Sequence, residues 1–262
     1  MPLLVWIILF TAVGGIASAA FAGVYLLLPE ATGQRLLPHF ISYATGALLG
    51  AALLALLPDA VEGVGREGAH SIGLAMVAGL GIFFVIEKLV LWWHTHGNGH
   101  VHGHNHAHDH GRDAASGVLV IIGDSIHNAL DGVLIAAAFL TSFPLGLVTT
   151  FAVAAHEIPH RVGDFAILVH SGMSRGRALV MNMATGLTSI IGGVAAYFGL
   201  QRTVGVLPYA LALAAAGFLY IAVAGLIPGL QRRADPRTSL AQVVLMGLGV
   251  ATIAWAESLA HQ

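Results

Sequence analysis

Long apolar runs, separated by short polar connections, are the feature of this sequence that most constrains its fold. A transmembrane helix needs about 20 mainly apolar residues to cross the hydrocarbon core of a bilayer. Eight segments of that length can be drawn, so we predict an all-α integral membrane protein with eight transmembrane helices in one transporter domain covering residues 1–262. The approximate limits of the segments are 3–28, 37–57, 71–93, 116–140, 144–170, 178–200, 205–229 and 239–259.

The composition excludes an ordinary soluble domain. Hydrophobic residues make up 57% of the chain and charged residues only 9%, whereas a soluble domain carries about 25% charged residues. The net charge of −2 predicts no nucleic-acid partner. Cysteine is absent, which excludes disulfide bonds and thiolate metal sites. We therefore expect the chain to be surrounded by a lipid bilayer, in the plasma membrane or a bacterial inner membrane.

The distribution of Lys and Arg predicts the orientation of the bundle. Cytoplasmic loops of membrane proteins are enriched in these residues. With the N-terminus outside, the outer side holds only Arg66 and Arg202, and both termini face outward. The cytoplasmic side then holds Arg35, Lys88, Arg112, Arg175, Arg177, Arg232, Arg233 and Arg237.

Two polar motifs lie in the middle of the fourth and fifth apolar segments. Residues 127–132 read His-Asn-Ala-Leu-Asp-Gly, and residues 156–161 read His-Glu-Ile-Pro-His-Arg. Ionisable side chains at that depth cost about 2.5–3.5 kcal/mol each on insertion scales, so a functional role is the default interpretation. The two segments are joined by the short stretch 141–144, which predicts antiparallel neighbours with both motifs at the same depth.

Four side chains of these motifs are the primary candidates for metal ligands. His127 and Asp131 are spaced i, i+4, and therefore share one helix face. His156 and His160 have the same spacing on the next helix. Imidazole nitrogens together with a carboxylate suit a divalent ion such as zinc. The sequence therefore predicts a metal site between the fourth and fifth helices.

Further polar groups adjoin these four. Asn128 and Glu157 each lie one step around the helix, where they could face a second metal position or, for Glu157, orient a histidine. Arg161 follows Glu157 by four residues, so it could neutralise that carboxylate and also stand in the place of a second metal ion. Asp124 and Asp164, about one turn away from the motif histidines, are candidates for the metal path or for a supporting hydrogen-bond network.

The long connection at 94–114 is rich in histidine and almost free of large apolar residues, so it cannot pack a core. We interpret it as a cytoplasmic loop with multivalent affinity for metal, although a solvated linker has the same composition. Its histidines are His94, His96, His100, His102, His104, His106, His108 and His110.

These motifs resemble the ZIP (Zrt/Irt-like) family of divalent-metal transporters, and the similarity covers most of the chain. Residues 123–132 resemble the family's D-x-x-H-N-x-x-D-G signature, and residues 156–168 resemble its HExPHExGDFAIL signature. Weaker similarities cover residues 46–58, 79–88 and 216–222.

The resemblance implies a zinc importer with eight helices, both termini outside, and a transport site on the fourth and fifth helices. It assigns His127, Asp131, His156 and His160 to the main metal site. It also implies that Asn128 and Glu157 belong to a neighbouring site, with Asp131 able to bridge the two. The substrate would be Zn²⁺, with Fe²⁺, Mn²⁺ and Cd²⁺ as further candidates, and the protein would be no enzyme and would need no cofactor. A homodimer is left open.

This sequence departs from the family pattern in two places. Arg161 stands where the family has the second glutamate of HExPHE, so we expect a single metal ion with Arg161 paired to Glu157. Ala51 and Ala55 stand where an aspartate and a histidine are common, which removes ligands from the second helix.

Two other functions share parts of these motifs. His156 to His160 also reads HExxH, the zincin motif, and Leu130-Asp131-Gly132 occurs in intramembrane zinc metalloproteases, although there it follows HExxH instead of preceding it. A cation-diffusion-type metal exporter has paired HxxxD sites like that of His127 and Asp131, but usually six helices and a soluble tail. A metal sensor that does not transport is a third alternative.

Overall fold

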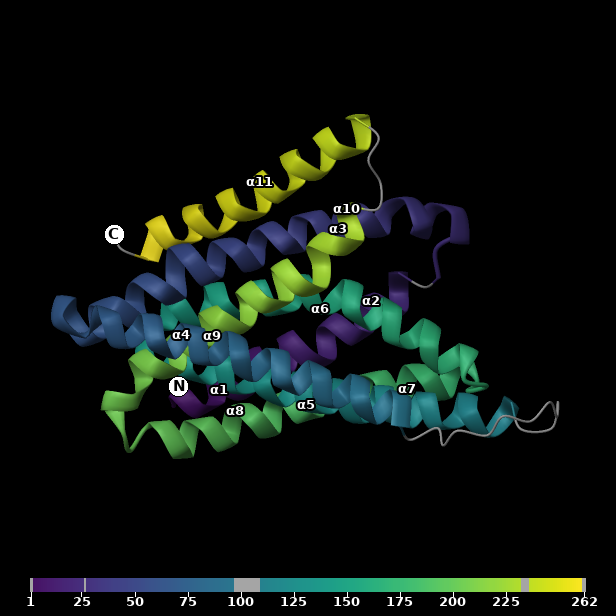
Figure 1. The fold of residues 1–262 in the computed structure, drawn as a ribbon, viewed down its shortest axis with the longest axis horizontal. Coiled ribbons are helices and arrows are strands. Elements are labelled where there is room, and N and C mark those ends of the chain that lie inside the picture. The colour runs from purple at the N-terminus through teal and green to yellow at the C-terminus, as the bar shows by residue number, and fades with distance from the viewer. Residues whose placement is uncertain (1, 26, 97–108, 232–235, 261–262) are drawn as a thin grey trace.

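The computed structural model describes residues 2–25, 27–96, 109–231 and 236–260, and all regular elements in these ranges are helices (Figure 1). This confirms the predicted all-α class. The elements in chain order are α1 (Leu3–Ala12), η1 (Val13–Ala17), α2 (Ser18–Tyr25), α3 (Glu30–Gly50), η2 (Ala51–Leu56), α4 (Leu57–His96), α5 (Asp109–Thr141), α6 (Phe143–His170), α7 (Arg175–Thr185), α8 (Leu187–Leu200), η3 (Val204–Val206), α9 (Leu207–Tyr220), η4 (Ile221–Leu226), α10 (Ile227–Gln231) and α11 (Pro236–Ala260).

Six stretches of the described chain are long and apolar enough to cross a membrane. One of them, Ala31–Leu89, is 59 residues long and contains two of the predicted segments. Within it the helix is broken at Gly65, whose φ of 70° and ψ of 176° are not helical. The chain reverses direction near this residue, so most of α4 runs in the direction opposite to α3 (Figure 1).

The predicted segment 144–170 is not among the six stretches, although α6 is 28 residues long. The reason is its own polar motif, because histidine, glutamate, arginine and aspartate lower the mean hydropathy of this helix. Figure 1 shows that α1 begins and α11 ends at one end of the bundle, opposite the end at which α4 ends and α5 begins.

The helices pack mainly in two groups, which meet where α6 packs against α3. In one group α5 packs against α1, α6 and α8, and α6 also packs against α2 and α7. In the other, α4 packs against α9, and α3 packs against α11. Helices α5 and α6 are separated by the single residue Ser142, whose hydroxyl accepts a hydrogen bond from the Leu145 amide (3.2 Å) and caps α6. The prediction that these two helices are neighbours is therefore confirmed.

Close backbone contact between α5 and α8 holds the first motif in place. A Cβ atom on Gly132 would lie 1.8 Å from the Ser189 carbonyl oxygen, and one on Gly192 would lie 2.0 Å from that of Ala129. Only glycine fits at such distances, because any larger side chain would force the two helices apart. Small residues at helix contacts are the usual means of close packing within a membrane.

We predict that Gly192→Ala lowers the thermal stability of the purified protein in detergent. Overpacking of this kind costs about 1–3 kcal/mol, which corresponds to a fall in Tm of several degrees. Gly199→Ala is the matched control on the same helix, because a Cβ there meets no atom within 4 Å. Equal Tm values for the two variants would contradict this account of the α5–α8 contact.

Candidate metal centre

Four side chains from α5 and α6 converge on one point inside the bundle. The Nε2 atoms of His127 and His156 are 3.4 Å apart. The Oδ2 atom of Asp131 lies 3.7 Å from the first of these nitrogens and 3.5 Å from the second. The Oε1 atom of Glu157 lies 3.3 Å and 3.8 Å from the same two nitrogens. We call these atoms of His127, Asp131, His156 and Glu157 the four-atom cluster.

The spacing of the cluster is close to that of a tetrahedral zinc site. Ligands at about 2.0–2.1 Å from a tetrahedral ion lie about 3.3–3.4 Å from one another. The five distances given above run from 3.3 to 3.8 Å. An ion could therefore be bound with only small movements of these side chains.

Two carboxylate oxygens of the cluster lack a hydrogen-bond donor. Oδ2 of Asp131 and Oε1 of Glu157 are both buried and accept no hydrogen bond from the described residues. Buried polar atoms normally have partners, because leaving them unpaired costs free energy. A cation between the four atoms would satisfy both oxygens at once. This is the feature of the cluster that most directly indicates a metal ligand set.

One cluster histidine is held in an orientation suited to binding. His156 is almost fully buried, and its Nδ1 atom lies 3.2 Å from the carbonyl oxygen of Ala152. Since a carbonyl can only accept, Nδ1 carries the proton and Nε2 presents a lone pair to the cluster. The side chain of His127 is 21% exposed, which makes it the most accessible member of the cluster.

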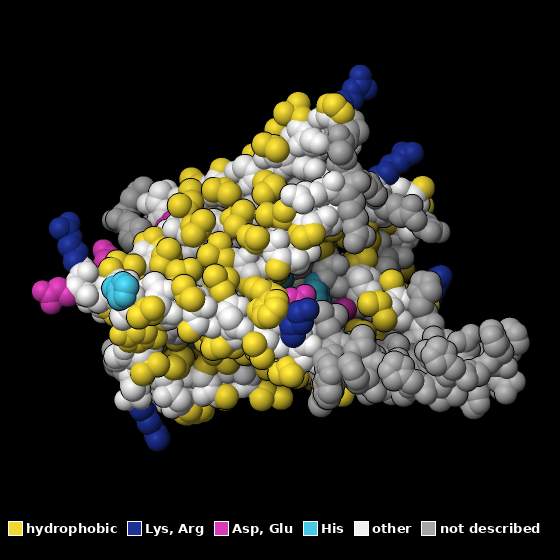
Figure 2. Space-filling view, in the orientation of Figure 1, with side chains coloured by type: hydrophobic (Ala, Val, Ile, Leu, Met, Phe, Trp, Pro, Cys, Tyr) yellow, Lys and Arg dark blue, Asp and Glu magenta, His cyan; other side chains and the backbone are white. Residues whose placement is uncertain are grey.

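The cluster is accessible toward one end of the bundle. A cavity of about 540 Å³ adjoins His127 and is lined by the side chains of Asp124, His160, Asp164 and Glu87, among others. Figure 2 shows acidic and histidine side chains within a hollow of the otherwise mainly apolar face. Toward the other end, the following turns of α5 (residues 134–139) and the preceding turns of α6 are buried in the apolar core.

The structure places His160, predicted as a primary ligand, outside the four-atom cluster. Its Nδ1 atom lies 2.9 Å from Asp164 Oδ2 and 3.9 Å from Asp124 Oδ1. Its ring stacks on that of His127, with centroids 5.1 Å apart. Asp124, Glu157 and His160 form a second group whose ligand atoms lie within 4.8 Å of one another. His160 thus lies along the cavity, one turn beyond the cluster.

Arg161 is completely buried beside the cluster and is surrounded by oxygen atoms. Its Nε atom donates to Glu157 Oε2 (2.8 Å), and one terminal nitrogen contacts Asp124 Oδ2 (2.7 Å). Glu157 therefore uses one oxygen for Arg161 and presents the other to the cluster. The remaining contacts of the guanidinium group are the carbonyl and side-chain oxygens of Asn182, the hydroxyl of Thr185 and the side-chain oxygen of Asn128.

Asn128, predicted to face a second metal position, instead belongs to this arginine network. Its Nδ2 atom donates to the carbonyl oxygen and to Oδ1 of Asp124, both at 2.8 Å. From the sequence alone Asn182 of α7 is a possible extra metal donor, whereas Thr185 was not identified; both contact Arg161 in the structure. The signal that could have found Thr185 is its spacing of three residues from Asn182, which places the two side chains on one helix face.

The other sequence predictions about ligands are placed as follows. Ala51 and Ala55 lie in η2 and are buried in the apolar core, so this part of the second segment offers no ligand. His94 and His96 fall at the end of α4, and His110 falls near the start of α5. The loop histidines that lie outside the described residues are His100, His102, His104, His106 and His108.

Comparison with known proteins agrees with the motifs. A model of the ZIP zinc transporter family matches residues 3–118 and 96–256. Zinc transporter ZIP13 of Pongo abelii is 33% identical over 240 residues, which cover 86% of this chain and 68% of that protein. Human zinc transporter ZIP13 is 32% identical (86% and 71% covered), and rat zinc transporter SLC39A7 is 31% identical (90% and 69% covered). The chain is an integral multi-pass membrane protein and belongs to the ZIP zinc transporter family.

Proposed function

We propose that this protein moves zinc across the membrane toward the cytoplasm, and that the four-atom cluster between α5 and α6 is its transport site. The observation that carries this proposal is the near-tetrahedral arrangement of two imidazole nitrogens and two carboxylate oxygens, both oxygens lacking a donor. Family membership supports transport as the activity, since the similar proteins are named zinc transporters.

We further propose that the chain crosses the membrane eight times, with both termini outside. The break at Gly65 divides the longest apolar stretch into two helices, and α6 is long enough to cross. With these two additions the six stretches become eight. The excess of Lys and Arg at the end of the bundle where α4 meets α5 supports the orientation. The cavity beside His127 then opens to the cytoplasm, and the plasma membrane or a bacterial inner membrane is the proposed location.

The donor set supports zinc as the substrate. Zinc favours four-coordinate tetrahedral sites made of histidine nitrogens and carboxylate oxygens. Fe²⁺, Mn²⁺ and Cd²⁺ are the competitors to test, because affinity alone does not decide selectivity among such ions. Transporter architecture suggests a mechanism in which one helix group moves against the other. The protein would thereby change between outward-open and inward-open states.

We propose that one metal ion binds, because Arg161 fills the neighbouring position. Two carboxylates, two amides and a hydroxyl surround its guanidinium group, a set of oxygens that would otherwise suit a hard divalent cation. A second ion there would have to displace Arg161 or be repelled by it at short range. His160, Asp124 and Asp164 are then groups that an ion meets on its way along the cavity.

The comparisons do not support the protease and exporter alternatives, and the geometry disfavours the protease. In a zincin both histidines of HExxH bind the metal, and the glutamate remains unbound as the base. Here Glu157 is a member of the cluster, whereas His160 pairs with Asp164. We therefore do not assign a protease activity to this protein.

We predict that His156→Ala abolishes saturable zinc-65 uptake into proteoliposomes that contain the purified protein. Loss of a side chain that only supports a metal ligand lowers affinity or activity about 10–100-fold. His156 is itself a proposed ligand, so its loss should have a larger effect. His70→Ala is the control, because His70 is exposed and lies outside both groups of metal-binding side chains. Uptake at the wild-type rate by a folded His156→Ala protein would contradict the proposed site.

We also predict that Arg161→Glu raises the zinc content of the purified protein from one ion to two. The substitution replaces the only positive charge in the oxygen-rich position with a further ligand. Arg161→Lys keeps the charge and should keep one ion. Metal content would be measured by mass spectrometry on gel-filtered protein prepared in zinc. Two ions in the wild type, or one ion in a folded Arg161→Glu protein, would contradict the single-metal proposal.

A further inference from the structure

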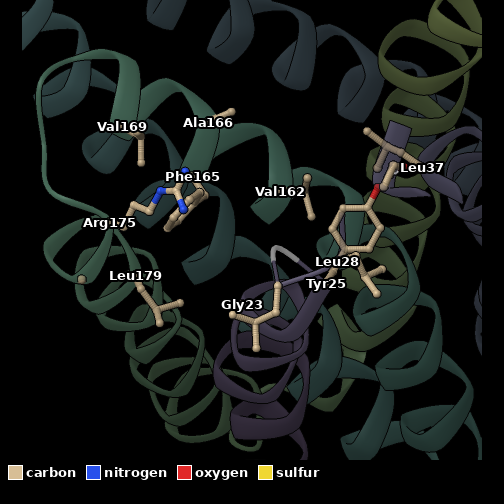
Figure 3. Close-up of a pocket in the computed structure, with 13 residues that line it drawn as sticks. Gly23, Tyr25, Leu28, Leu37, Val162, Phe165, Ala166, Val169, Arg175 and Leu179 are labelled. Atoms are coloured by element: carbon tan, nitrogen blue, oxygen red, sulfur yellow. Dashed lines mark hydrogen bonds between the residues drawn. The ribbon is translucent and has the colours of Figure 1, made fainter. Parts of the chain in front are cut away.

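A second cavity, of about 680 Å³, lies away from the metal centre, among α2, α3, α6 and α7 (Figure 3). Its volume falls within the range of about 300–1,000 Å³ that small-molecule sites occupy. Figure 3 shows Val169, Phe165 and Arg175 on one side of the space and Tyr25 and Leu37 on the other. The Tyr25 hydroxyl donates to the Gly33 carbonyl oxygen, which ties the end of α2 to α3.

The chemistry of this cavity is apolar with one positive charge. Leucine, valine, phenylalanine, alanine and glycine make up most of the described residues that line it, and none of them is acidic. Arg175 is the one charged side chain among them. It is exposed and begins α7, directly after the turn that follows α6. Arg175 therefore lies where the chain leaves one membrane-spanning stretch and enters the next.

This combination indicates the kind of occupant. An apolar space that opens within a bilayer is in contact with acyl chains, and a basic residue at its edge attracts an anionic headgroup. Basic pockets between transmembrane helices on the cytoplasmic side bind anionic lipids in this way. We propose that the cavity binds one anionic phospholipid, with an acyl chain beside Phe165 and Val169 and the headgroup phosphate at Arg175.

A lipid in this cavity would contact α6, the helix that carries His156 and Glu157. Val162, Phe165 and Val169 belong to α6, and Val162 directly follows the buried Arg161. Leu37 belongs to α3, which packs with α11 in the other group of helices. A lipid in the cavity would contact both groups at once. Lipid binding itself does not depend on the proposed zinc transport.

The test measures lipid that stays with the protein. Wild type would be reconstituted in vesicles with equal amounts of phosphatidylglycerol and phosphatidylcholine of matched chains, extracted in mild detergent, and examined by native mass spectrometry. We expect retained phosphatidylglycerol to exceed phosphatidylcholine. In Arg175→Gln we expect this preference to fall about fivefold, the contribution of one basic residue at an anionic surface.

Two further variants distinguish the contribution of the headgroup to lipid retention from that of the acyl chain. Arg177→Gln is the matched control, because Arg177 is exposed on the same helix but does not line the cavity, and it should retain the wild-type preference. Val169→Trp should obstruct the part of the cavity beside Phe165 and reduce retention of both lipids. Millimolar inorganic phosphate should not displace the lipid, which distinguishes a phospholipid site from a phosphate site.

Several outcomes would overturn the proposal: equal retention of the two lipids by wild type, equal losses in Arg175→Gln and Arg177→Gln, full retention in Val169→Trp, or displacement by phosphate. Each can occur whether or not the protein transports zinc, so failure here is distinct from failure of the proposed transport function.

Discussion

The geometry of the candidate metal centre depends on the buried ion pairs of Arg161. This guanidinium group is completely shielded from solvent and contacts the carboxylates of Glu157 and Asp124 at 2.8 and 2.7 Å. Removing one partner of such a buried pair is strongly destabilising, because the other charge is then left uncompensated. The positive charge of Arg161 therefore compensates the buried carboxylate of Glu157. Arg161 also leaves the other Glu157 oxygen facing the histidines, and in our proposal it fills the position that a second ion would take.

Helix packing supplies the rest of the geometry. Gly132 and Gly192 let α5 and α8 touch through their backbones, and Ser142 turns the chain directly from α5 into α6. These contacts bring His127 and His156 together with their Nε2 atoms 3.4 Å apart. The four proposed ligands come from two adjoining helices of one packing group, so a movement of that group would carry the whole cluster with it.

The sequence predicted the helical class, the neighbouring α5 and α6, and the presence of a polar site between them. These features follow from apolar run length, i, i+4 spacing and the short connection 141–144, all of which can be read locally along the sequence. It could not predict which polar side chain faces which partner, because that depends on how the helices are rotated and crossed. His160 was expected in the cluster but pairs with Asp164, whereas Glu157 takes the place expected for it. Asn182 and Thr185 reach Arg161 only because α7 packs against α6.

Length and apolarity alone give six candidate crossings in the described residues, fewer than the eight that we propose. Hydropathy merges the helices on either side of Gly65, and it omits α6 because the polar side chains of the second motif lower its mean hydropathy. The omitted helix is the one that carries His156 and Glu157. A cluster of polar side chains inside a membrane helix thus weakens the hydropathy signal by which that helix is recognised.

The central claim is that one zinc ion is bound by two imidazoles and two carboxylates, with Arg161 beside it. X-ray absorption at the zinc edge, on wild-type protein loaded with zinc, tests this most directly. The account predicts two histidine nitrogens and two oxygens at about 2.0–2.2 Å, with no zinc–zinc scattering. A third imidazole, which would bring His160 into the coordination sphere, or a second zinc within a few ångströms would contradict it.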